Sequence, residues 1–390
     1  MEKIRVAFFA DILIEEFDGA SRTMFQLIRR IDPRRFEFLF ICGTGPDTLA
    51  ACECIRIPSL TLPFNNTYSV ALPQLAGKAL EDKLQAFAPD VVHIATPSLL
   101  GNYALRFAHH RGIPVLTIYH THFISYLDYY LSKAPFLIRY ARESMAAVHT
   151  RFYNQCDRIY VPSESIAREK VAMGVSPGRI MIWKRGIDTV LFNPGKRNPA
   201  LMKRLVGNTR PVILFASRLV WEKNLETLIR IYNLCRQAEL PYNFVIAGDG
   251  VARKACEQQM PGAVFLGKVD HQTLSGLYAS ADIFLFTSIS ETYGNVVAEA
   301  MASGLPCVIA DGGGSADFVA QGENGFKCDP GDAADYVGKL RLVLENRAVW
   351  ERFAAAGRAL SLTLDWEQLA GQYFHEIGKM AGQLAAGELA

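Results

Sequence analysis

The sequence has no long apolar run, no CxxC cysteine pair and no strong excess of charge of either sign. No hydrophobic stretch approaches the about 20 residues that a membrane-spanning helix requires. The eight cysteines are scattered, which favours free, buried thiols in a reducing compartment over a zinc site. A net charge of +2 gives no reason to expect a nucleic-acid partner. Residues 1–17 show neither a long apolar h-region nor a cleavage site. We therefore expect a cytoplasmic protein, and a peripheral position on the inner face of the cell membrane stays open.

Two further motifs are missing. Neither half carries GxGxxG, which counts against a nicotinamide-dependent dehydrogenase. There is also no DxD motif, and no carboxylate accompanies His120 and His122 in the run Tyr119–His122. We therefore expect no metal site.

The 390 residues, half of them hydrophobic, suit two domains of under about 200 residues each. Short apolar runs such as Ile4–Ala10, Val91–Ile94, Val212–Ala216 and Ile283–Phe286 alternate with helical patterns. This alternation predicts parallel sheets that are covered by helices on both faces. Residues 193–211, rich in proline, are the best linker candidate. We expect domains at 1–193 and 194–365, with an amphipathic helix at 366–390 that packs back onto the first domain.

Two cations follow the first predicted strand of the second domain. Arg218 and Lys223 come after Val212–Ala216 and just before a predicted helix. At the carboxyl end of a strand they would clamp a diphosphate, Arg218 by a fork of hydrogen bonds and Lys223 as a point charge. The alternative is a pair of surface cations.

The segment 290–301 combines a turn and a helix start. It follows the strand Ile283–Phe286, and Gly294 would let the backbone approach a ligand closely. The free N–H groups of the helix start would face an anion. Glu291 and Glu299 flank this region, where sugar and ribose hydroxyls are natural partners for carboxylates. A solvated helix face is the alternative for Glu299, although its apolar neighbours argue against it.

Other strand ends carry weaker signals. Gly248 follows the strand Phe244–Ala247 in a Gly-Asp-Gly turn, for which a structural role is the preferred interpretation. Val269 closes the next strand, where a nucleobase would meet backbone groups. Gly19 opens a helix after the first strand, and His120 ends the strand Pro114–Tyr119. Arg185 follows the last strand of the first domain.

Residues 291–306, ETYGNVVAEAMASGLP, resemble the E-x7-E signature of retaining family 4 glycosyltransferases, which have the GT-B fold. Further matches to that family are its donor-diphosphate pair, its G-[IV]-D-x3-F-x-P segment, its first-domain histidine and its glycine loop, found here as Arg218 and Lys223, Gly186–Pro194, His120 and Gly19. More narrowly, Ile118–His122 and Trp183–Asp188 are similar to sulfoquinovosyl-diacylglycerol synthases and to bacterial mannosyl- and glucosyltransferases that act on glycolipids. Those enzymes use UDP- or GDP-sugars.

The resemblance implies two doubly wound Rossmann-like α/β domains with the nucleotide sugar bound in the cleft between them. It implies a retaining, metal-independent hexosyltransferase with no cofactor beyond its nucleotide-sugar substrate. The expected catalytic residues are His120, Arg218, Lys223 and Glu291. The expected donor-binding residues are Gly19, Arg185, Gly248, Val269, Tyr293, Gly294, Asn295, Val296 and Glu299.

The acceptor is less constrained. The stretch Phe123–Phe152 interleaves aromatic residues with Arg139, Arg142 and Arg151, which suits an anionic membrane surface and a lipid or glycolipid acceptor. A packed helix with a charged outer face explains the stretch equally well. A soluble acceptor, or a sugar-nucleotide epimerase or phosphorylase of the same fold, remains an alternative. A two-domain binding protein without activity would leave Arg218 and Lys223 unexplained.

Overall fold

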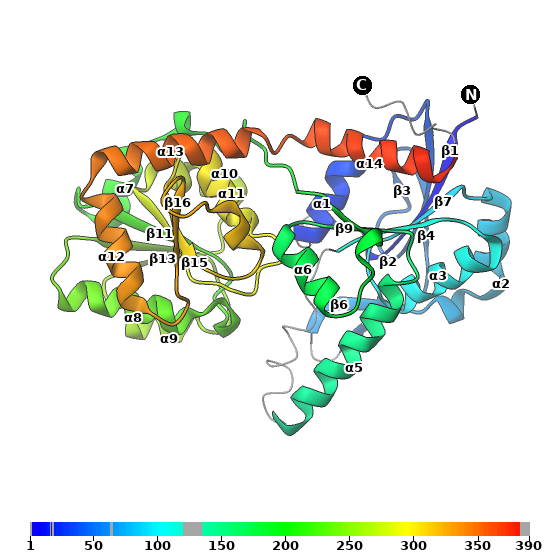
Figure 1. The fold of residues 1–390 in the computed structure, drawn as a ribbon, viewed down its shortest axis with the longest axis horizontal. Coiled ribbons are helices and arrows are strands. Elements are labelled where there is room, and N and C mark those ends of the chain that lie inside the picture. Colours follow the sequence, from blue (N-terminus) through cyan, green and yellow to red (C-terminus); the bar gives the residue numbers. More distant parts are fainter. Residues whose placement is uncertain (1, 16, 18, 63–64, 120–134, 383–390) are drawn as a thin grey trace. The chain divides into compact units, whose positions relative to one another are not determined.

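The chain divides into two units (Figure 1). The computed structural model describes residues 2–15, 17, 19–62, 65–119 and 135–382. Unit 1 contains Met1–Lys184 and Trp366–Ala390, and unit 2 contains Arg185–Asp365. Each unit has its own sheet, covered by helices on both faces, as the alternation of apolar runs and helical patterns predicts.

Unit 1 is built around an eight-stranded sheet. The strands are β1 (Ile4–Ile12), β2 (Phe36–Thr44), β3 (Thr48–Leu49), β4 (Cys52–Arg56), β7 (Val91–Ile94), β8 (Val115–Ile118), β9 (Arg158–Val161) and β10 (Ile180–Ile182). Their order is β10-β9-β8-β7-β1-β2-β4-β3, parallel throughout except for the β3–β4 pair. A separate antiparallel hairpin joins β5 (Ser59–Leu62) to β6 (Asn65–Ala71).

The two faces of this sheet have separate cores because strand residues alternate in direction. Val6 and Phe8 of β1 belong to the core that also contains α1 (Gly19–Ile28) and α14 (Trp366–Met380). Ala7 and Phe9 belong to the core on the other face. The helices of that face are α2 (Pro73–Phe87), α3 (Leu99–Arg111), α5 (Pro135–Tyr153) and α6 (Glu164–Ala172).

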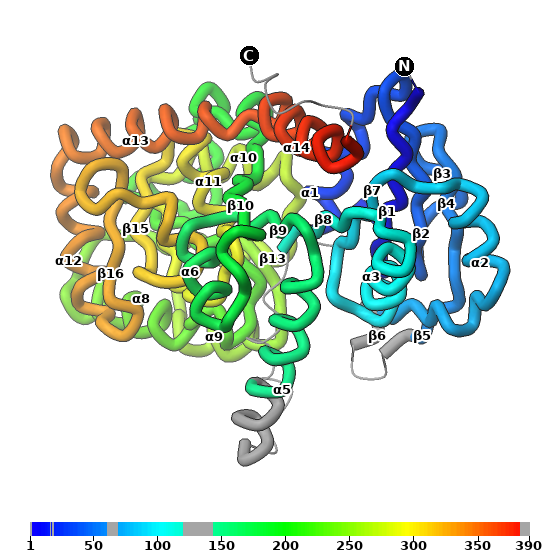
Figure 2. Tube along the Cα trace, turned by 45° about the vertical axis from the view of Figure 1, so that its right-hand side comes forward, coloured from blue at the N-terminus to red at the C-terminus, as the bar shows by residue number. Residues whose placement is uncertain are grey.

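The last helix, α14, completes unit 1 (Figure 2). Its apolar residues Tyr373 and Ile377 are buried against the sheet beside α1. The phenol of Tyr373 is hydrogen-bonded to Nδ1 of His93 in β7 at 2.8 Å. The indole N–H of Trp183 donates to the Leu369 carbonyl at 2.9 Å. The amphipathic stripe read from the sequence is thus buried within unit 1.

Unit 2 contains a six-stranded parallel sheet. Its strands are β11 (Val212–Ala216), β12 (Asn243–Ala247), β13 (Val264–Gly267), β14 (Ile283–Phe286), β15 (Cys307–Ala310) and β16 (Gly325–Cys328), in the order β13-β12-β11-β14-β15-β16. On one side lie α8 (Leu225–Gln237), α9 (Arg253–Gln259) and α12 (Ala333–Leu344); on the other lie α10 (His271–Ser280), α11 (Asn295–Ala302) and α13 (Arg347–Leu362) (Figure 1).

The strand order of unit 2 reverses between β11 and β14. From β11 the chain moves outward to β12 and β13, and it then returns to β14 on the other side of β11. The loops that leave the carboxyl ends of β11 and β14 therefore diverge, and ligands of doubly wound sheets bind at such switch points. The two loops are Ser217–Asn224 and Thr287–Gly294.

The structure differs from the sequence prediction around residues 193–211. This stretch folds inside unit 2 as a short 3-10 helix, η3 (Pro194–Lys196), followed by α7 (Pro199–Val206). Both prolines stand at the first helical position, where a missing N–H costs nothing. The division between the units lies at Lys184 and Arg185, whereas the sequence analysis divides the chain after residue 193.

Candidate functional site

The loop after β11 presents Arg218 and Lys223 in different environments. The side chain of Arg218 is 59 % exposed, whereas that of Lys223 is 7 % exposed. Lys223 ends a 3-10 helix, η4 (Trp221–Lys223), and Asn224 follows in the left-handed region with φ +55°. The Asn224 side chain donates to the carbonyls of Thr287 (3.2 Å) and Pro330 (2.9 Å). This anchoring turns Lys223 inward, toward the loop after β14.

Lys223 and Glu291 form an ion pair between the two loops. The Lys223 Nζ lies 2.6 Å from Oε1 of Glu291, and the Ser288 hydroxyl donates to the same oxygen at 3.4 Å. The hydroxyl of Thr287 donates to the Lys223 carbonyl at 3.0 Å. Two of the predicted catalytic residues are thus in direct contact at the switch point. Their spacing in the sequence gives no sign that they neutralise each other.

Gly294 precedes α11 at a point where a side chain has no room. Its φ is +86°, and a Cβ there would lie 2.5 Å from Cβ and 2.8 Å from Cα of Ser315. The close approach predicted for Gly294 is therefore made to the protein itself. Ser315 follows Gly312–Gly314, and the N–H of Gly314 donates to the Glu291 carbonyl at 2.7 Å. Sequence reasoning missed this supporting loop, although three consecutive glycines after a strand are a visible signal.

Glu299 is buried, at 8 % exposure, on α11. The alternative of a solvated helix face is therefore excluded. Its carboxylate lies near the fully buried phenol of Tyr278 in α10; burial, and next the charge of Glu299, raise the pKa of Tyr278. At the start of the same helix, Oδ1 of Asn295 is buried without a hydrogen-bond partner in the described part of the chain. Val296 packs against the core of unit 2.

Arg185 and Tyr293 form a second buried contact within unit 2. The Tyr293 hydroxyl donates to the Arg185 carbonyl at 2.8 Å, and the guanidinium lies 5.5 Å from the centre of the Tyr293 ring. Arg185 is 6 % exposed. Burial raises the pKa of Tyr293. The phenol therefore ties the Glu291 loop to the first residue of unit 2.

The Gly-Asp-Gly turn after β12 supports the Arg218 loop. A Cβ at Gly248 would lie 1.8 Å from the Ser217 carbonyl oxygen, and one at Gly250 would lie 2.4 Å from that of Leu219. The Leu219 N–H donates to the Asp249 carbonyl at 2.9 Å. Gly248 thus serves the packing role that its turn sequence favours. Val269, just after β13, is partly buried against the same core.

The remaining predicted residues lie elsewhere. Gly19 is the first residue of α1 in unit 1, where its carbonyl accepts from the Thr23 hydroxyl at 2.9 Å. His120 and His122 lie outside the described residues. Among the described residues, no three His, Cys, Asp or Glu side chains are grouped as a metal site requires. None of the described helices has the length and apolarity needed to span a bilayer.

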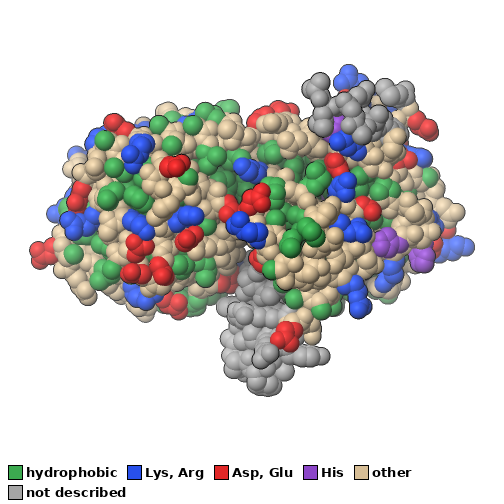
Figure 3. Space-filling model, in the orientation of Figure 1, with side chains coloured by type: hydrophobic (Ala, Val, Ile, Leu, Met, Phe, Trp, Pro, Cys, Tyr) green, Lys and Arg blue, Asp and Glu red, His purple; other side chains and the backbone are tan. Residues whose placement is uncertain are grey.

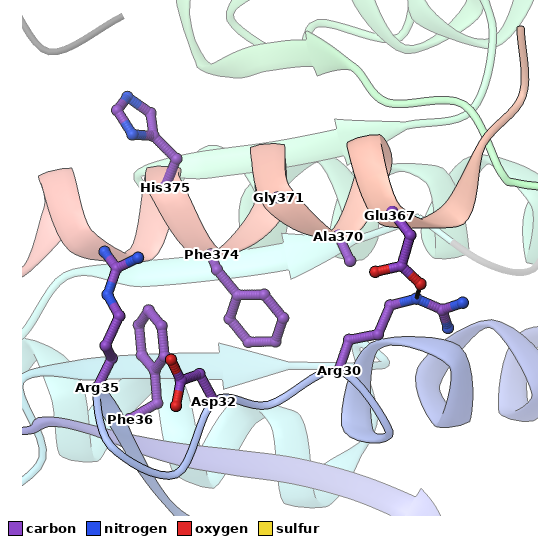
Figure 4. A pocket seen from close by; sticks show the side chains of 9 residues that line it. All are labelled: Arg30, Asp32, Arg35, Phe36, Glu367, Ala370, Gly371, Phe374 and His375. Atoms are coloured by element: carbon purple, nitrogen blue, oxygen red, sulfur yellow. Dashed lines mark hydrogen bonds and ion pairs between the residues drawn. The ribbon is translucent and has the colours of Figure 1, made fainter. Parts of the chain in front are cut away.

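A cavity of about 340 Å³ lies in unit 1, far from the carboxyl ends of the strands. It opens between α14 and the segment before β2, with Phe36 and Phe374 beside it (Figure 4). Arg30 and Glu367 on its rim form an ion pair at 2.8 Å. Because its charges are balanced and it lies at the amino end of β2, the cavity does not extend the candidate site. On the face of unit 2 seen in Figure 3, acidic and basic side chains are interspersed.

Comparison with known proteins identifies both halves of the chain. Residues 17–191 match the family model "Glycosyltransferase Family 4", and residues 199–360 match "Glycosyl transferases group 1". The GDP-mannose-dependent alpha-mannosyltransferase of Mycolicibacterium smegmatis is 30% identical over 96% of this chain and 98% of its own length. The Mycobacterium tuberculosis protein of the same name is 29% identical over 98% and 99%. The sulfoquinovosyl transferase of Arabidopsis thaliana is 31% identical over 80% of this chain, which spans 60% of that relative.

The fold is also found among solved structures. A protein of Anabaena, HepE, solved in complex with UDP, superposes with a TM-score of 0.76 over 96% of this chain and all of its own, at 18% identity. The GT-B fold predicted from the sequence is thereby confirmed, and the comparisons do not favour the epimerase or phosphorylase alternative. The chain belongs to the family 4, group 1 glycosyltransferases, enzymes that use nucleotide sugars as substrates.

Proposed function

We propose that the loops that leave the carboxyl ends of β11 and β14 bind the diphosphate and sugar of a nucleotide-hexose donor. The observation that carries the proposal is the contact between the Arg218–Lys223 loop and the Glu291–Gly294 loop at the switch point of the sheet. Two cations and the start of α11 are available there for a dianion. The carboxylates of Glu291 and Glu299 lie on the same loop and helix and can accept hydrogen bonds from the hydroxyl groups of the donor.

Stabilisation of the leaving group supplies most of the catalysis in this proposal. The diphosphate gains negative charge as the glycosidic bond breaks, and preorganised cations lower the energy of that state. Arg218 and Lys223 provide the charge, and N–H groups at the start of α11 add hydrogen bonds. Glu291 holds hydroxyls of the sugar, Glu299 holds the ribose, and His120 contributes from the first domain. No step requires a metal ion, because side chains neutralise the phosphates, and the configuration at the anomeric carbon is retained.

The donor we favour is GDP-mannose, with UDP-hexoses as the alternative. Both mannosyltransferases named above match the chain over nearly its whole length. Val269, after β13, stands where a nucleobase would meet the backbone, but it presents no side chain that distinguishes guanine from uracil.

The acceptor we favour is a hydroxyl of a membrane lipid or glycolipid. Support comes from the basic aromatic stretch Phe123–Phe152, of which the structure describes the side chains from 143 onward. In the last turns of α5, Arg151 is exposed and Val148 is 59 % exposed, whereas Phe152 is buried in the core of unit 1. The exposed part of α5 is the surface that would meet anionic lipid, and its buried end fixes the helix to the sheet.

A donor panel with and without acceptor tests these proposals. GDP-mannose, GDP-glucose and UDP-glucose are compared by the rise in melting temperature, since a ligand of the folded state stabilises it by mass action. The donor with the largest rise should then release nucleotide only when vesicles containing diacylglycerol and phosphatidylinositol are added, also in excess EDTA. Nucleotide release without acceptor would indicate an epimerase or a hydrolase. Activity that EDTA abolishes and Mg²⁺ restores would refute the metal-free mechanism.

A further inference from the structure

Glu222, which no motif singles out, lies between the two cations of the candidate site. It is the middle residue of η4 (Trp221–Lys223), and its Oε1 lies 3.2 Å from Nη2 of Arg218. The Glu222 side chain is 16 % exposed, whereas that of Arg218 is 59 % exposed. A largely buried acidic side chain thus contacts the guanidinium of a largely exposed arginine.

Stability does not explain this arrangement. Ion pairs that involve an exposed partner contribute little to folding, because water and salt screen them. Burying a carboxylate is unfavourable unless charges or hydrogen bonds compensate for the lost water. Within the part of the chain that the structure describes, Arg218 is the ion-pair partner found for Glu222. The carboxylate therefore loses hydration for a contact that stabilises the fold little.

The backbone around Glu222 is held firmly by the loop after β14. The Glu222 carbonyl accepts from the Ser290 hydroxyl at 3.1 Å, next to the Glu291 that pairs with Lys223. The following carbonyl, of Lys223, accepts from the Thr287 hydroxyl at 3.0 Å. The backbone at Glu222 is thus fixed to the loop that carries Glu291, the carboxylate proposed to bind the sugar. Among the described residues, the hydrogen bond to Glu222 is the one found for the Arg218 side chain.

We propose that Glu222 is a positioning residue that aligns the guanidinium of Arg218 with the donor diphosphate. The inference rests on the proposed function of Arg218. One Nη of the guanidinium is engaged by Glu222, and its other N–H groups remain available for phosphate oxygens. A long side chain held in this way loses less freedom when the donor binds. The cost is a carboxylate near an anionic ligand, which the second cation, Lys223, offsets.

Five variants, Arg218→Ala among them, test the proposal with GDP-mannose as the donor probe and GDP as the binding probe; UDP-glucose and UDP replace them if GDP-mannose is inactive. Glu222→Ala should lower kcat/KM about tenfold. Glu222→Gln should recover most of the loss, because its amide oxygen accepts the same hydrogen bond. In the Arg218→Ala background, adding Glu222→Ala should change kcat/KM by less than twofold. Glu226→Ala, an exposed acid four residues further on in α8, is the matched control and should behave as wild type.

The outcomes separate this inference from the proposed function. Full activity of Arg218→Ala would refute the diphosphate clamp itself, whatever Glu222 does. A loss in Arg218→Ala with wild-type activity in Glu222→Ala would overturn only the positioning role. So would equal losses from Glu222→Ala in both backgrounds. Tighter GDP binding and faster turnover in Glu222→Gln would also overturn it, since Glu222 would then merely compete with the phosphates for Arg218.

Discussion

At the scale of single residues, the two cations of the proposed donor site differ in what surrounds them. Lys223 is buried against Glu291, whereas Arg218 is largely exposed against Glu222. In the absence of donor each cation has a carboxylate as counter-ion. In the proposed function, binding of a diphosphate exchanges the Glu291 partner of Lys223 for phosphate, whereas Arg218 keeps its contact with Glu222. Because one ion pair is buried and the other is exposed, removing the two cations should affect the stability of the fold differently.

Replacing these cations should separate stability from activity. Arg218→Ala and Lys223→Met should each lower turnover by a factor of about 10²–10³, because each removes charge that stabilises the leaving group. Arg218→Ala should change the free energy of unfolding by less than about 0.5 kcal/mol. Lys223→Met should lower it by about 1–3 kcal/mol, because Glu291 is left partly buried without its cation. Denaturant unfolding and initial rates give both quantities.

A second substitution serves as the control. Adding Glu291→Gln to Lys223→Met removes the unpaired charge, so it should restore most of the stability and none of the activity. If Lys223→Met alone is as stable as wild type, the ion pair does not form in the donor-free protein.

At the scale of elements, the proposed donor site is built from loops that are in close contact with one another. The turn after β14 passes so close to Ser315 that only a glycine fits at 294, and it is held from below by Gly312–Gly314. The turn after β12 supports the Arg218 loop in the same way through Gly248 and Gly250. The positions of Arg218, Lys223 and Glu291 are thus set by neighbouring backbones.

Gly294→Ala should disturb both folding and the site. Its φ of +86° is unfavourable for alanine, and the added Cβ meets the backbone and side chain of Ser315. We expect a loss of at least about 2 kcal/mol in the free energy of unfolding and weaker nucleotide binding. Gly338→Ala is the matched control, because a Cβ in that α12 position meets nothing within 4 Å. It should stabilise by about 0.5–1 kcal/mol. Identical behaviour of the two variants would contradict this account.

Strand ends were predictable from the sequence, but contacts between loops were not. The continuous apolar runs before Arg218 and Glu291 mark buried parallel strands, and their carboxyl ends share one edge of the sheet. Nothing in the spacing of Lys223 and Glu291 indicates that they pair, because that depends on the reach of two irregular loops. The strands β3–β6 were missed because they lack the continuous apolar runs that mark the buried parallel strands. The stretch 193–211 was misjudged because proline marks helix starts as well as linkers.

At the scale of the whole molecule, unit 1 is assembled from two distant parts of the chain. His93 of β7 and Tyr373 of α14 meet in its core, where the imidazole is stacked on Phe8 with ring centres 4.1 Å apart. Arg158 and Glu376 form a second link, at 2.7 Å. Burial lowers the pKa of His93 to about 3. The attachment of α14 is therefore linked to pH.

The sign of this linkage follows from the two states of His93. An imidazole in the unfolded chain titrates near pH 6.5, whereas in the folded protein it stays neutral down to about pH 3. As the pH falls below about 6.5, the imidazole of His93 binds a proton in the unfolded state but not in the folded state. Stability is therefore lost by up to about 1.4 kcal/mol per pH unit over that range.

Unfolding experiments at a series of pH values check the effect. His93→Leu should be less stable at pH 7, because the Tyr373 hydroxyl loses its partner, yet its stability should fall less steeply between pH 6.5 and 4.5. His110→Leu, at the exposed end of α3, should keep the wild-type slope. The carboxylates are the same in all variants, so their contribution to the slope of stability against pH cancels in this comparison. Equal slopes for His93→Leu and wild type would show that the imidazole does not remain neutral in the fold.

The discontinuity of unit 1 has a consequence for the order in which the protein is made. A ribosome completes all of unit 2, Arg185–Asp365, before it reaches the helix whose Phe374 packs against Phe36 and Phe38 of the first sheet. Until α14 emerges, one face of that sheet lacks part of its apolar cover, and such surface binds chaperones or aggregates. The nascent enzyme thus carries an unfinished first half while its second half folds. A chain interrupted before Trp366 would therefore present the exposed apolar surface by which cells recognise products for degradation.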